Sequence, residues 1–323
     1  MSALYPLKFI PQPKYRIWGG NHLNDTLPEE SKMDKLGEIW CLSGVYENVS
    51  EVENGKLKGK KLNEIIEIYR EKLLGKKVWE KFGHEFPLLI KFIDAAEPLS
   101  VQVHPNDELA KQLHDSMGKS EMWYIMEAEE NAELIIGFEK GTTEEDYLQH
   151  LKNETLEKIL QKVPVKKGDV VYIPAGRVHA IGKGIVLAEI QQSSDITYRI
   201  YDYNRIEKDG KKRELHTDLA LRAIDFYPIE KIKTEYSEKE NEFSTLIDSP
   251  YFASKIFKGN KTVRITENDQ FRIYLCTEGN AKFKTETADV DLNKYECVLM
   301  PAEIESFEIV PQNSCNLIEG KIP

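Results

Sequence analysis

The sequence has few cysteines, no long apolar run and no recognisable leader. The cysteines Cys41, Cys276, Cys297 and Cys315 lie far apart and form no CxxC pair, which argues against a zinc knuckle and against a dense disulfide framework. No run of 18 apolar residues occurs, and the N-terminus, MSALYPLKFIPQPKY, lacks a basic segment followed by an apolar one. We therefore expect a cytoplasmic protein with reduced thiols that neither crosses a membrane nor is secreted.

An excess of positive charge is also missing. Lysine and arginine number 44 against 55 aspartates and glutamates, which gives a formal net charge of −11. This balance argues against nucleic acid and anionic membranes as partners. Hydrophobic residues make up 41% of the 323 residues and charged residues 31%, as in ordinary globular proteins of one or two domains. An anionic substrate would need a local cluster of cationic side chains.

Hydrophobic periodicity predicts a mostly β chain with a few helices. Residues 62–74 have apolar side chains at helical spacing and predict one amphipathic helix. A second helix is predicted within residues 142–161, where Thr142 and Glu145 have capping-box spacing. Shorter helices are expected in residues 106–114 and 217–226. Short β-branched and aromatic runs predict strands in the segments FPLLIKFIDA, AELIIGFE, GDVVYIPAG, IVLAEIQQ and FRIYLCTEG.

One segment is echoed later in the chain. VKKGDVVYIPAGRVHAI, from Val165, aligns without gaps with LNKYECVLMPAEIESFE, from Leu292, at an offset of 301 − 174 = 127 residues. The second copy has Tyr295 in place of Gly168 and Ser306 in place of His179. The echo predicts two related β-barrels, of which only the first keeps the histidine.

Side chains suited to metal binding begin in PLSVQVHPND, residues 98–107. In an extended strand, Gln102 and His104 point to one face while Val101 and Val103 point to the other. Glu121, in GKSEMWYI, and His179, in IPAGRVHAIG, bring the set to two imidazoles, one carboxylate and one amide. Such a set suits zinc, with manganese, cobalt or iron as alternatives. Because Glu121 is the single anionic ligand, a divalent ion would keep about one net positive charge and act as a Lewis acid.

These blocks and their neighbours resemble a known family. KFIDAAEPLSVQVHPND, GKSEMWYI, PAGRVHAIG and AEIQQSSDITYRIYDYNR, with YRIWGGNHL and GEIWCLSG nearer the start, are similar in sequence and order to the short bacterial form of type I phosphomannose isomerase. The similarity runs from about residue 8 to about residue 225. It implies a cupin fold and a single zinc ion per chain, held by residues that fall here on Gln102, His104, Glu121 and His179. The implied reaction is metal-dependent interconversion of mannose 6-phosphate and fructose 6-phosphate through an enediol(ate).

The resemblance also implies catalytic residues. Arg199 matches the family's catalytic arginine, and its permanent charge suits a phosphate or a developing oxyanion. Asp195 and Glu189 match acidic positions, and either is a candidate for moving the proton between C1 and C2. Lys119 matches a lysine beside the substrate. After Arg199 the chain reads IYDYNR, which differs from longer relatives, so Arg205 is a candidate for part of the substrate recognition.

Two alternatives remain open from the residues. A cupin oxygenase using iron would want two histidines and a carboxylate, without the added glutamine. A sugar-phosphate binding protein without turnover would keep the same ligands. We expect residues 1–235 to form the catalytic metal-binding cupin domain with helical segments, and residues 236–323 a C-terminal barrel lacking metal ligands. The partners expected are sugar phosphates, and the chain a monomer or homodimer.

Overall fold

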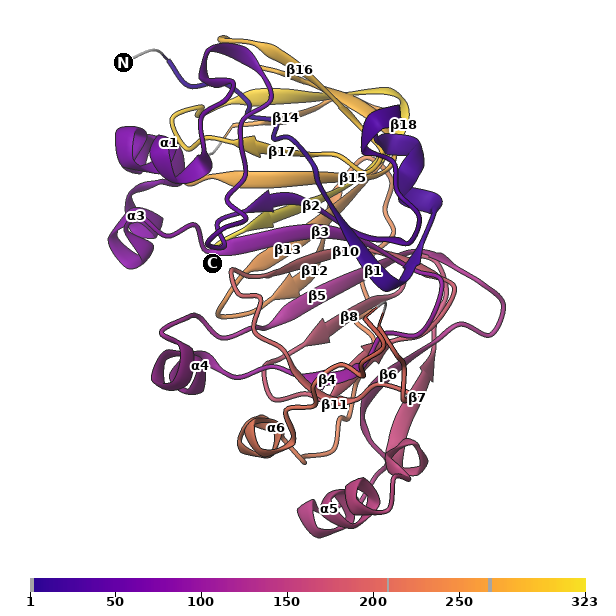
Figure 1. The fold of residues 1–323 in the computed structure, drawn as a ribbon. Coiled ribbons are helices and arrows are strands. Elements are labelled where there is room, and N and C mark those ends of the chain that lie inside the picture. The colour runs from indigo at the N-terminus through magenta and orange to yellow at the C-terminus, as the bar shows by residue number, and fades with distance from the viewer. Residues whose placement is uncertain (1–2, 208, 267–268) are drawn as a thin grey trace. The chain divides into compact units, whose positions relative to one another are not determined.

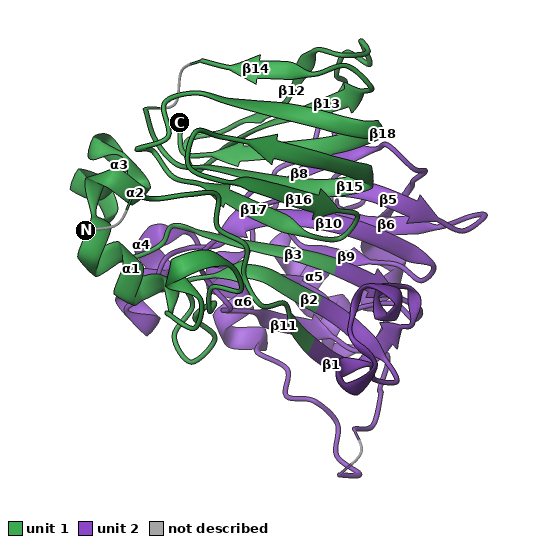
Figure 2. Cartoon of the chain, turned by 90° about the horizontal axis from the view of Figure 1, so that it is seen from above, with its two compact units in different colours: residues 1–13, 39–92, 235–323 green, residues 14–38, 93–234 purple. Residues whose placement is uncertain are grey.

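The computed structural model describes residues 3–207, 209–266 and 269–323, and it confirms the mostly β class (Figure 1). The chain divides into two compact units (Figure 2). Unit 1 comprises residues 1–13, 39–92 and 235–323, and unit 2 comprises residues 14–38 and 93–234. None of the helices in the described ranges has the length and apolarity that a membrane crossing requires. The predicted division of the chain near residue 235 stays a prediction.

Three strands run from one unit into the other. They are β1 (Gln12–Gly20), β2 (Leu36–Ser43) and β3 (Leu88–Ala95).

Unit 2 holds the segments in which the metal ligands are predicted. Its further strands are β4 (Val101–Val103), β5 (Glu121–Ala128), β6 (Glu133–Phe138), β7 (Leu160–Pro164), β8 (Val170–Ile173), β9 (His179–Ile181), β10 (Ile185–Gln192) and β11 (Tyr198–Tyr201). Its helices are α4 (Asp107–His114), α5 (Glu144–Lys152) and α6 (Thr217–Ala223), with short 3-10 turns η1 (His22–Thr26), η2 (Glu29–Ser31) and η4 (Leu156–Ile159).

Two antiparallel layers enclose the interior of unit 2. One contains β10, β5 and β8 in that order, and the other has the order β11-β4-β9-β6-β7. A buried cluster draws on both layers, with Trp123 from β5, Leu134 from β6 and Ile181 from β9, so it fills the space between them. A second cluster, which includes Val101 and Val103, packs the other face of β4 and β11 with residues of α5 and α6. The period of two predicted for this strand is therefore confirmed.

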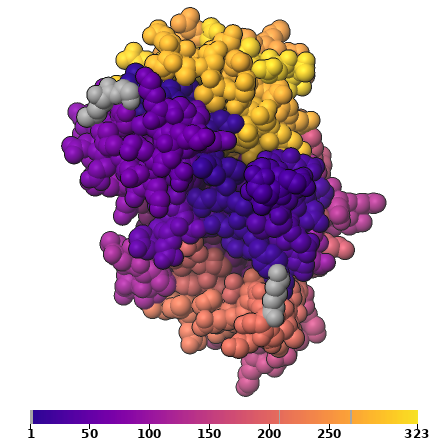
Figure 3. Space-filling model, turned by 45° about the horizontal axis from the view of Figure 1, so that its top comes forward, coloured from indigo at the N-terminus to yellow at the C-terminus, as the bar shows by residue number. Residues whose placement is uncertain are grey.

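Unit 1 is built on one seven-stranded sheet with the order β12-β13-β18-β15-β16, in which β14 pairs with β18 and β17 with β15. Figure 3 colours the chain from indigo at the N-terminus to yellow at the C-terminus. Leu7, near the N-terminus, pairs with Leu299 in the C-terminal part of the chain, and both residues belong to this unit. Its strands are β12 (Phe243–Asp248), β13 (Ala253–Gly259), β14 (Val263–Ile265), β15 (Arg272–Lys284), β16 (Asp289–Asn293), β17 (Cys297–Met300) and β18 (Phe307–Lys321). Its helices are α1 (Leu62–Tyr69), α2 (Glu71–Leu74) and α3 (Lys76–Phe82), with the 3-10 turn η3 (Gly55–Leu57).

Two helix predictions need correction. The single helix predicted over residues 62–74 is broken at Arg70, whose φ of 49° is outside the helical region. The second helix has its capping box one residue later than predicted, with Thr143 and Asp146 bonded reciprocally. Thr142 instead donates its hydroxyl to the Glu139 carbonyl. The spacing of threonine and acidic residues predicts that a helix starts here. The hydrogen bond from Thr142 to Glu139 uses the Thr142 hydroxyl in the preceding turn, so Thr143 caps the helix instead.

The internal echo has a counterpart in the backbone. Strands β8 and β17 begin and end at the same offset, since 297 − 170 = 127 and 300 − 173 = 127. The turns before them match as well, because Lys166 donates to Asp169 as Asn293 donates to Glu296. Gly168 has φ 91°, and its counterpart Tyr295 has φ 67°, so a non-glycine residue adopts the left-handed conformation in the second copy.

Candidate metal and substrate site

Three of the predicted ligands meet in the interior of unit 2. His104 directly follows β4, Glu121 is the first residue of β5, and His179 is the first residue of β9. One ligand atom from each lies within 4.8 Å of the others, and all three residues are buried. A buried group of two histidines and a carboxylate could bind a metal.

Hydrogen bonds fix the orientation of both imidazoles. His104 donates from Nδ1 to the Ile196 carbonyl at 2.8 Å, and His179 donates from Nδ1 to the Arg177 carbonyl at 2.8 Å. Each bond leaves Nε2 of that ring as the atom that faces Glu121, at 3.2 Å for His104 and 3.7 Å for His179. Carbonyl partners of this kind are common behind metal-binding histidines, because they select the tautomer whose other nitrogen is a ligand.

The protonation states suit a cation. Burial, with the positive charge of Lys119, lowers the pKa of His104 to about 3, and burial also lowers the pKa of His179. For Glu121, burial raises the pKa, but interactions with its neighbours, led by the positive charge of Lys119, outweigh burial and bring the pKa well below its usual range. At neutral pH the group is therefore two neutral imidazoles and one carboxylate, the forms that bind metals.

Unpartnered atoms test whether a metal fits. Oε2 of Glu121 and Nε2 of His179 are buried, and neither has a hydrogen-bond partner among the described residues. Buried polar atoms without a partner are costly, and a carboxylate oxygen especially so. The Lys119 ammonium lies 2.8 Å from Oε1 of Glu121 and 3.2 Å from Nε2 of His104, so a positive charge already interacts with the other side of the cluster. The donor set therefore fits a divalent metal.

Gln102 and Arg199 extend this site across the sheet. In the ladder of β11, β4 and β9, Arg199 lies opposite Gln102, and Gln102 lies opposite His179. Directly opposed residues of antiparallel strands share a face, so all three side chains belong to the face away from Val101 and Val103. The Arg199 guanidinium donates to the Ser100 hydroxyl at 3.3 Å and the Glu214 carbonyl at 2.8 Å.

The two acidic candidates lie in different surroundings. Glu189, on β10, is 3% exposed and accepts a 2.7 Å hydrogen bond from the indole of Trp123. The Trp123 ring also makes an edge contact with His179, with ring centroids 5.4 Å apart. Asp195 is exposed in the loop between β10 and β11, and it has no hydrogen bond or ion pair with the described residues. The structure therefore places Glu189 next to Trp123, which itself contacts His179, and leaves Asp195 exposed.

Some residues of the site were not anticipated. Trp123 is two residues after Glu121, so the strand period already placed it on the same face, and this signal was available. Gln192 holds the segment before Glu121, because its amide accepts from Ser120 N at 2.9 Å and donates to Asp107 at 2.9 Å. No local pattern in the sequence links Gln192 to Asp107, which is 85 residues away.

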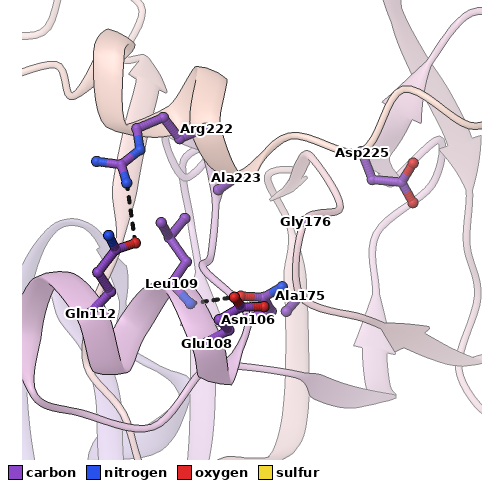
Figure 4. Close-up of a pocket in the computed structure, with 9 residues that line it drawn as sticks. All are labelled: Asn106, Glu108, Leu109, Gln112, Ala175, Gly176, Arg222, Ala223 and Asp225. Atoms are coloured by element: carbon purple, nitrogen blue, oxygen red, sulfur yellow. Dashed lines mark hydrogen bonds between the residues drawn. The ribbon is translucent and has the colours of Figure 1, made fainter.

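A pocket of about 330 Å³ lies beside α4 and α6 in unit 2 (Figure 4). It is lined by Asn106, Glu108, Leu109, Gln112, Ala175, Gly176, Arg222, Ala223 and Asp225. Arg222 donates to Gln112 across it at 3.4 Å, while Asn106 caps α4 through Leu109 N. None of the predicted ligands or catalytic residues lines this pocket, so we assign it no part in the site.

Comparison with known proteins identifies the family. The family described as "Phosphomannose isomerase type I, catalytic domain" matches residues 7–160. "Mannose-6-phosphate isomerase ManA" of Bacillus subtilis is 36% identical over 96% of this chain and 97% of its own length. "Mannose-6-phosphate isomerase" of Streptococcus mutans is 34% identical over 94% of each chain. The crystal structure of mannose 6-phosphate isomerase from Bacillus subtilis superposes with a TM-score of 0.88 and 32% identity, covering 98% of this chain and 99% of that one. The chain belongs to the type I phosphomannose isomerase family.

Proposed function

We propose that this enzyme interconverts mannose 6-phosphate and fructose 6-phosphate through an enediol(ate), using one zinc ion per chain. The observation that carries the proposal is the buried cluster of His104, Glu121 and His179, with fixed tautomers and unpartnered ligand atoms, in a chain whose full-length relatives are named mannose-6-phosphate isomerases. The proposed ligands are Gln102, His104, Glu121 and His179.

Zinc is the proposed metal because of the ligand chemistry. Imidazole nitrogens with one carboxylate and one amide oxygen are a borderline-hard set that zinc accepts readily. When bound, zinc would supply Lewis acidity that polarises the sugar carbonyl and stabilises the negative charge of the enediolate. Gln102 contributes a neutral oxygen, so Glu121 is the only ligand that reduces the positive charge.

The chain's own residues would then move the proton. Isomerisation needs one group that takes a proton from C2 and returns it at C1. Glu189 is favoured by its burial and by its hydrogen bond from Trp123, which orients one carboxylate oxygen. Asp195 is favoured because it matches an acidic position of the family and because its side chain is exposed. Both remain candidates, and the pH–rate profiles of Glu189→Gln and Asp195→Asn would separate them.

Two cationic side chains complete the proposal. Arg199 lies on the same sheet face as Gln102, so its guanidinium can hold the developing oxyanion or the phosphate. Lys119 contacts Glu121 and His104 directly, so it adds positive charge next to the carbonyl. In a protein of formal charge −11, these two residues and the metal provide the local positive potential that a sugar phosphate requires.

The predictions about location, oligomeric state, partners and domain bounds are kept as proposals. We propose a cytoplasmic location, a monomer or homodimer, and no nucleic acid or membrane partner. We also keep residues 1–235 as the catalytic domain and residues 236–323 as a barrel without metal ligands. All four cysteines are buried free thiols, which supports a reducing compartment.

The function is tested by supplying mannose 6-phosphate and coupling the formation of fructose 6-phosphate to a reporter enzyme. Turnover should disappear after chelation and return when zinc is added. Activity that survives complete removal of metal would contradict the proposal, and binding of mannose 6-phosphate without turnover in the zinc-loaded protein would favour a binding role.

A further inference from the structure

A buried carboxylate organises two arginines near the site. Asp202, 6% exposed, directly follows β11. Its two oxygens accept from the Arg213 guanidinium, with Nε at 2.8 Å and Nη2 closer, in a bidentate arrangement. Asp202 also accepts from Arg205, with Nε at 3.1 Å and a closer contact from Nη2. Planar two-point contacts of this kind fix the direction of a guanidinium as well as its position.

The segment that carries Arg213 runs alongside Arg199. Arg199 donates from its side chain to the Glu214 carbonyl at 2.8 Å, and its backbone exchanges hydrogen bonds with His216 at 2.7 Å and 3.2 Å. The pKa of Arg199 is lowered by burial first and then by the charge of Arg213, as expected for neighbouring guanidiniums. The residue that follows Arg213 therefore contacts the arginine that lies opposite Gln102, and the charge of Arg213 acts on that arginine.

Unused hydrogen-bond donors distinguish this cluster from a closed ion-pair network. The side-chain hydrogen bonds of Arg199 use Nε and Nη1, and those of Arg213 use Nε and Nη2. Nη2 of Arg199 and Nη1 of Arg213 donate to no acceptor in the part of the chain that the structure describes. Arg205 is more fully engaged, since Nη1 donates to the Pro98 carbonyl and the other two nitrogens bond Asp202.

The charges of the cluster favour an anion. Arg199, Arg205 and Arg213 contribute three positive charges, against the carboxylates of Asp202 and of Glu207, which lies 3.6 Å from Arg213. One positive charge remains in excess among these five residues, before Lys119 and the metal are counted. A phosphate monoester carries about 1.5 to 2 negative charges at neutral pH and offers three acceptor oxygens.

We propose that Arg213 is a second phosphate-binding residue beside Arg199, and that Asp202 is the positioning residue that aims it. The inference rests on the proposed function, because it assigns the phosphate of the sugar substrate to this cluster. It predicts that Arg213 determines specificity for the phosphorylated sugar. The reacting carbons at the metal are not touched by Arg213, so the chemical step itself should not depend on it.

The test compares Arg213→Gln and Asp202→Asn with the wild-type zinc enzyme. For Arg213→Gln we expect KM for mannose 6-phosphate and the inhibition constant of inorganic phosphate to rise together by about 10- to 100-fold, as for loss of hydrogen bonds to a charged group. The value of kcat should change by less than about 3-fold, because uniform binding is removed. Asp202→Asn should shift both constants in the same direction by a smaller factor.

Arg222→Gln is the matched control. It removes one positive charge from α6 of the same unit, where Arg222 bonds Gln112, and should leave both constants within about 2-fold. Arg213→Lys keeps the charge without the bidentate geometry and should give an intermediate loss. If Arg213→Gln fails to fold, Arg213→Lys decides the question.

The outcomes separate the two proposals. A wild-type protein that does not isomerise mannose 6-phosphate overturns the proposed function, and calorimetric titration with inorganic phosphate still tests the cluster. If the wild type turns over and Arg213→Gln or its lysine variant leaves KM and phosphate inhibition unchanged, only the role of Arg213 is overturned. A fall in kcat with unchanged KM and unchanged phosphate inhibition would also overturn the role of Arg213, because it indicates a structural effect on the active site.

Discussion

Strand β5 in unit 2 and strand β15 in unit 1 pair with their partner strands in equivalent ways. They carry side chains of opposite charge at the corresponding position, Glu121 in β5 and Arg272 in β15. β5 pairs with β8 from Glu121 to Tyr124, and β15 pairs with β17 from Arg272 to Leu275, at a constant offset of 272 − 121 = 151. In this correspondence Arg272 occupies the place of the proposed ligand Glu121. The position equivalent to His179, at the offset of 127, is Ser306.

A buried glutamate is retained in both units. Trp123 lies opposite Glu189 and donates to it at 2.7 Å, while Tyr274 lies opposite Glu319 and donates to it at 2.7 Å. The fold therefore repeats a strand pair with an aromatic donor and a carboxylate. Arg272 then pairs with Glu319 at 3.0 Å, so unit 1 supplies its own cation. In unit 2 the equivalent position is the anion Glu121, whose Oε1 pairs with Lys119 while its Oε2 has no hydrogen-bond partner among the described residues, which suits a bound cation.

The largest effect is expected from Glu121→Gln, which removes the one carboxylate among the four proposed metal ligands. Metal content should fall and turnover should drop by about 1000-fold or more, because the Lewis acid is lost. The measurement is metal analysis by mass spectrometry together with the coupled assay. Arg272→Met is the counterpart in unit 1 and should retain wild-type metal content and kcat. Equal loss of metal in both variants would show that the two positions do not differ as described.

Arg272→Met should in turn destabilise the fold. Removing one partner leaves the Glu319 carboxylate buried without its ion pair, which typically costs about 3–5 kcal/mol. Chemical denaturation of the metal-free protein measures this change. The double variant Arg272→Met with Glu319→Leu should recover most of the stability, since both charges are then absent. A double variant that is no more stable than the single one would argue against an unpaired charge as the cause.

The two aromatic donors give a smaller, paired test. Trp123→Phe and Tyr274→Phe each remove a hydrogen bond to a buried glutamate, worth about 1.5–3 kcal/mol when the acceptor is charged. Thermal and chemical unfolding should show a loss of that order for both. Only Trp123→Phe should also lower kcat, because Glu189 and His179 both contact this indole. A comparable loss of kcat in Tyr274→Phe would contradict the separation of roles.

The smallest effect is the part of the pH dependence of stability that comes from Tyr274 in unit 1. Burial, followed by the charge of Glu319, raises the pKa of Tyr274 well above its ordinary value of about 10. Because the folded pKa is raised, the stabilisation is complete below pH 10 and is lost as the pH rises through the folded pKa. The free energy of unfolding should fall above pH 10 by at most about 1.4 kcal/mol per pH unit from this group. Tyr274→Phe should have a shallower slope, whereas Trp123→Phe should retain the wild-type slope.

Much of the site was accessible from local patterns. Alternation in PLSVQVHPND put Gln102 opposite to Val101 and Val103 before any pairing was known, and the two valines are indeed buried in the cluster on the other face. The strand prediction for IVLAEIQQ coincides with β10. The metal and catalytic roles of the named residues stay predictions, although His104, Glu121 and His179 do come together.

Other features depended on distant contacts. The break at Arg70 is not visible in helical periodicity, because the apolar spacing continues through it. One cluster is formed by Asp202, Arg205 and Arg213, which lie up to 11 residues apart in the chain. No pattern in the sequence predicts that this loop folds back to bring them together. Gln192 reaches Asp107 across 85 residues, and only the folded chain makes that contact.

By itself the sequence determined which residues share a strand face, where most elements lie and which ligand chemistry is available, because side-chain direction within a strand follows a local period of two. Only the tertiary structure decided the cross-strand register that aligns Arg199, Gln102 and His179, and the placement of Arg213 beside them. The physical reason is that register is set by pairing between distant segments, and a shift of one residue would turn every side chain to the other face.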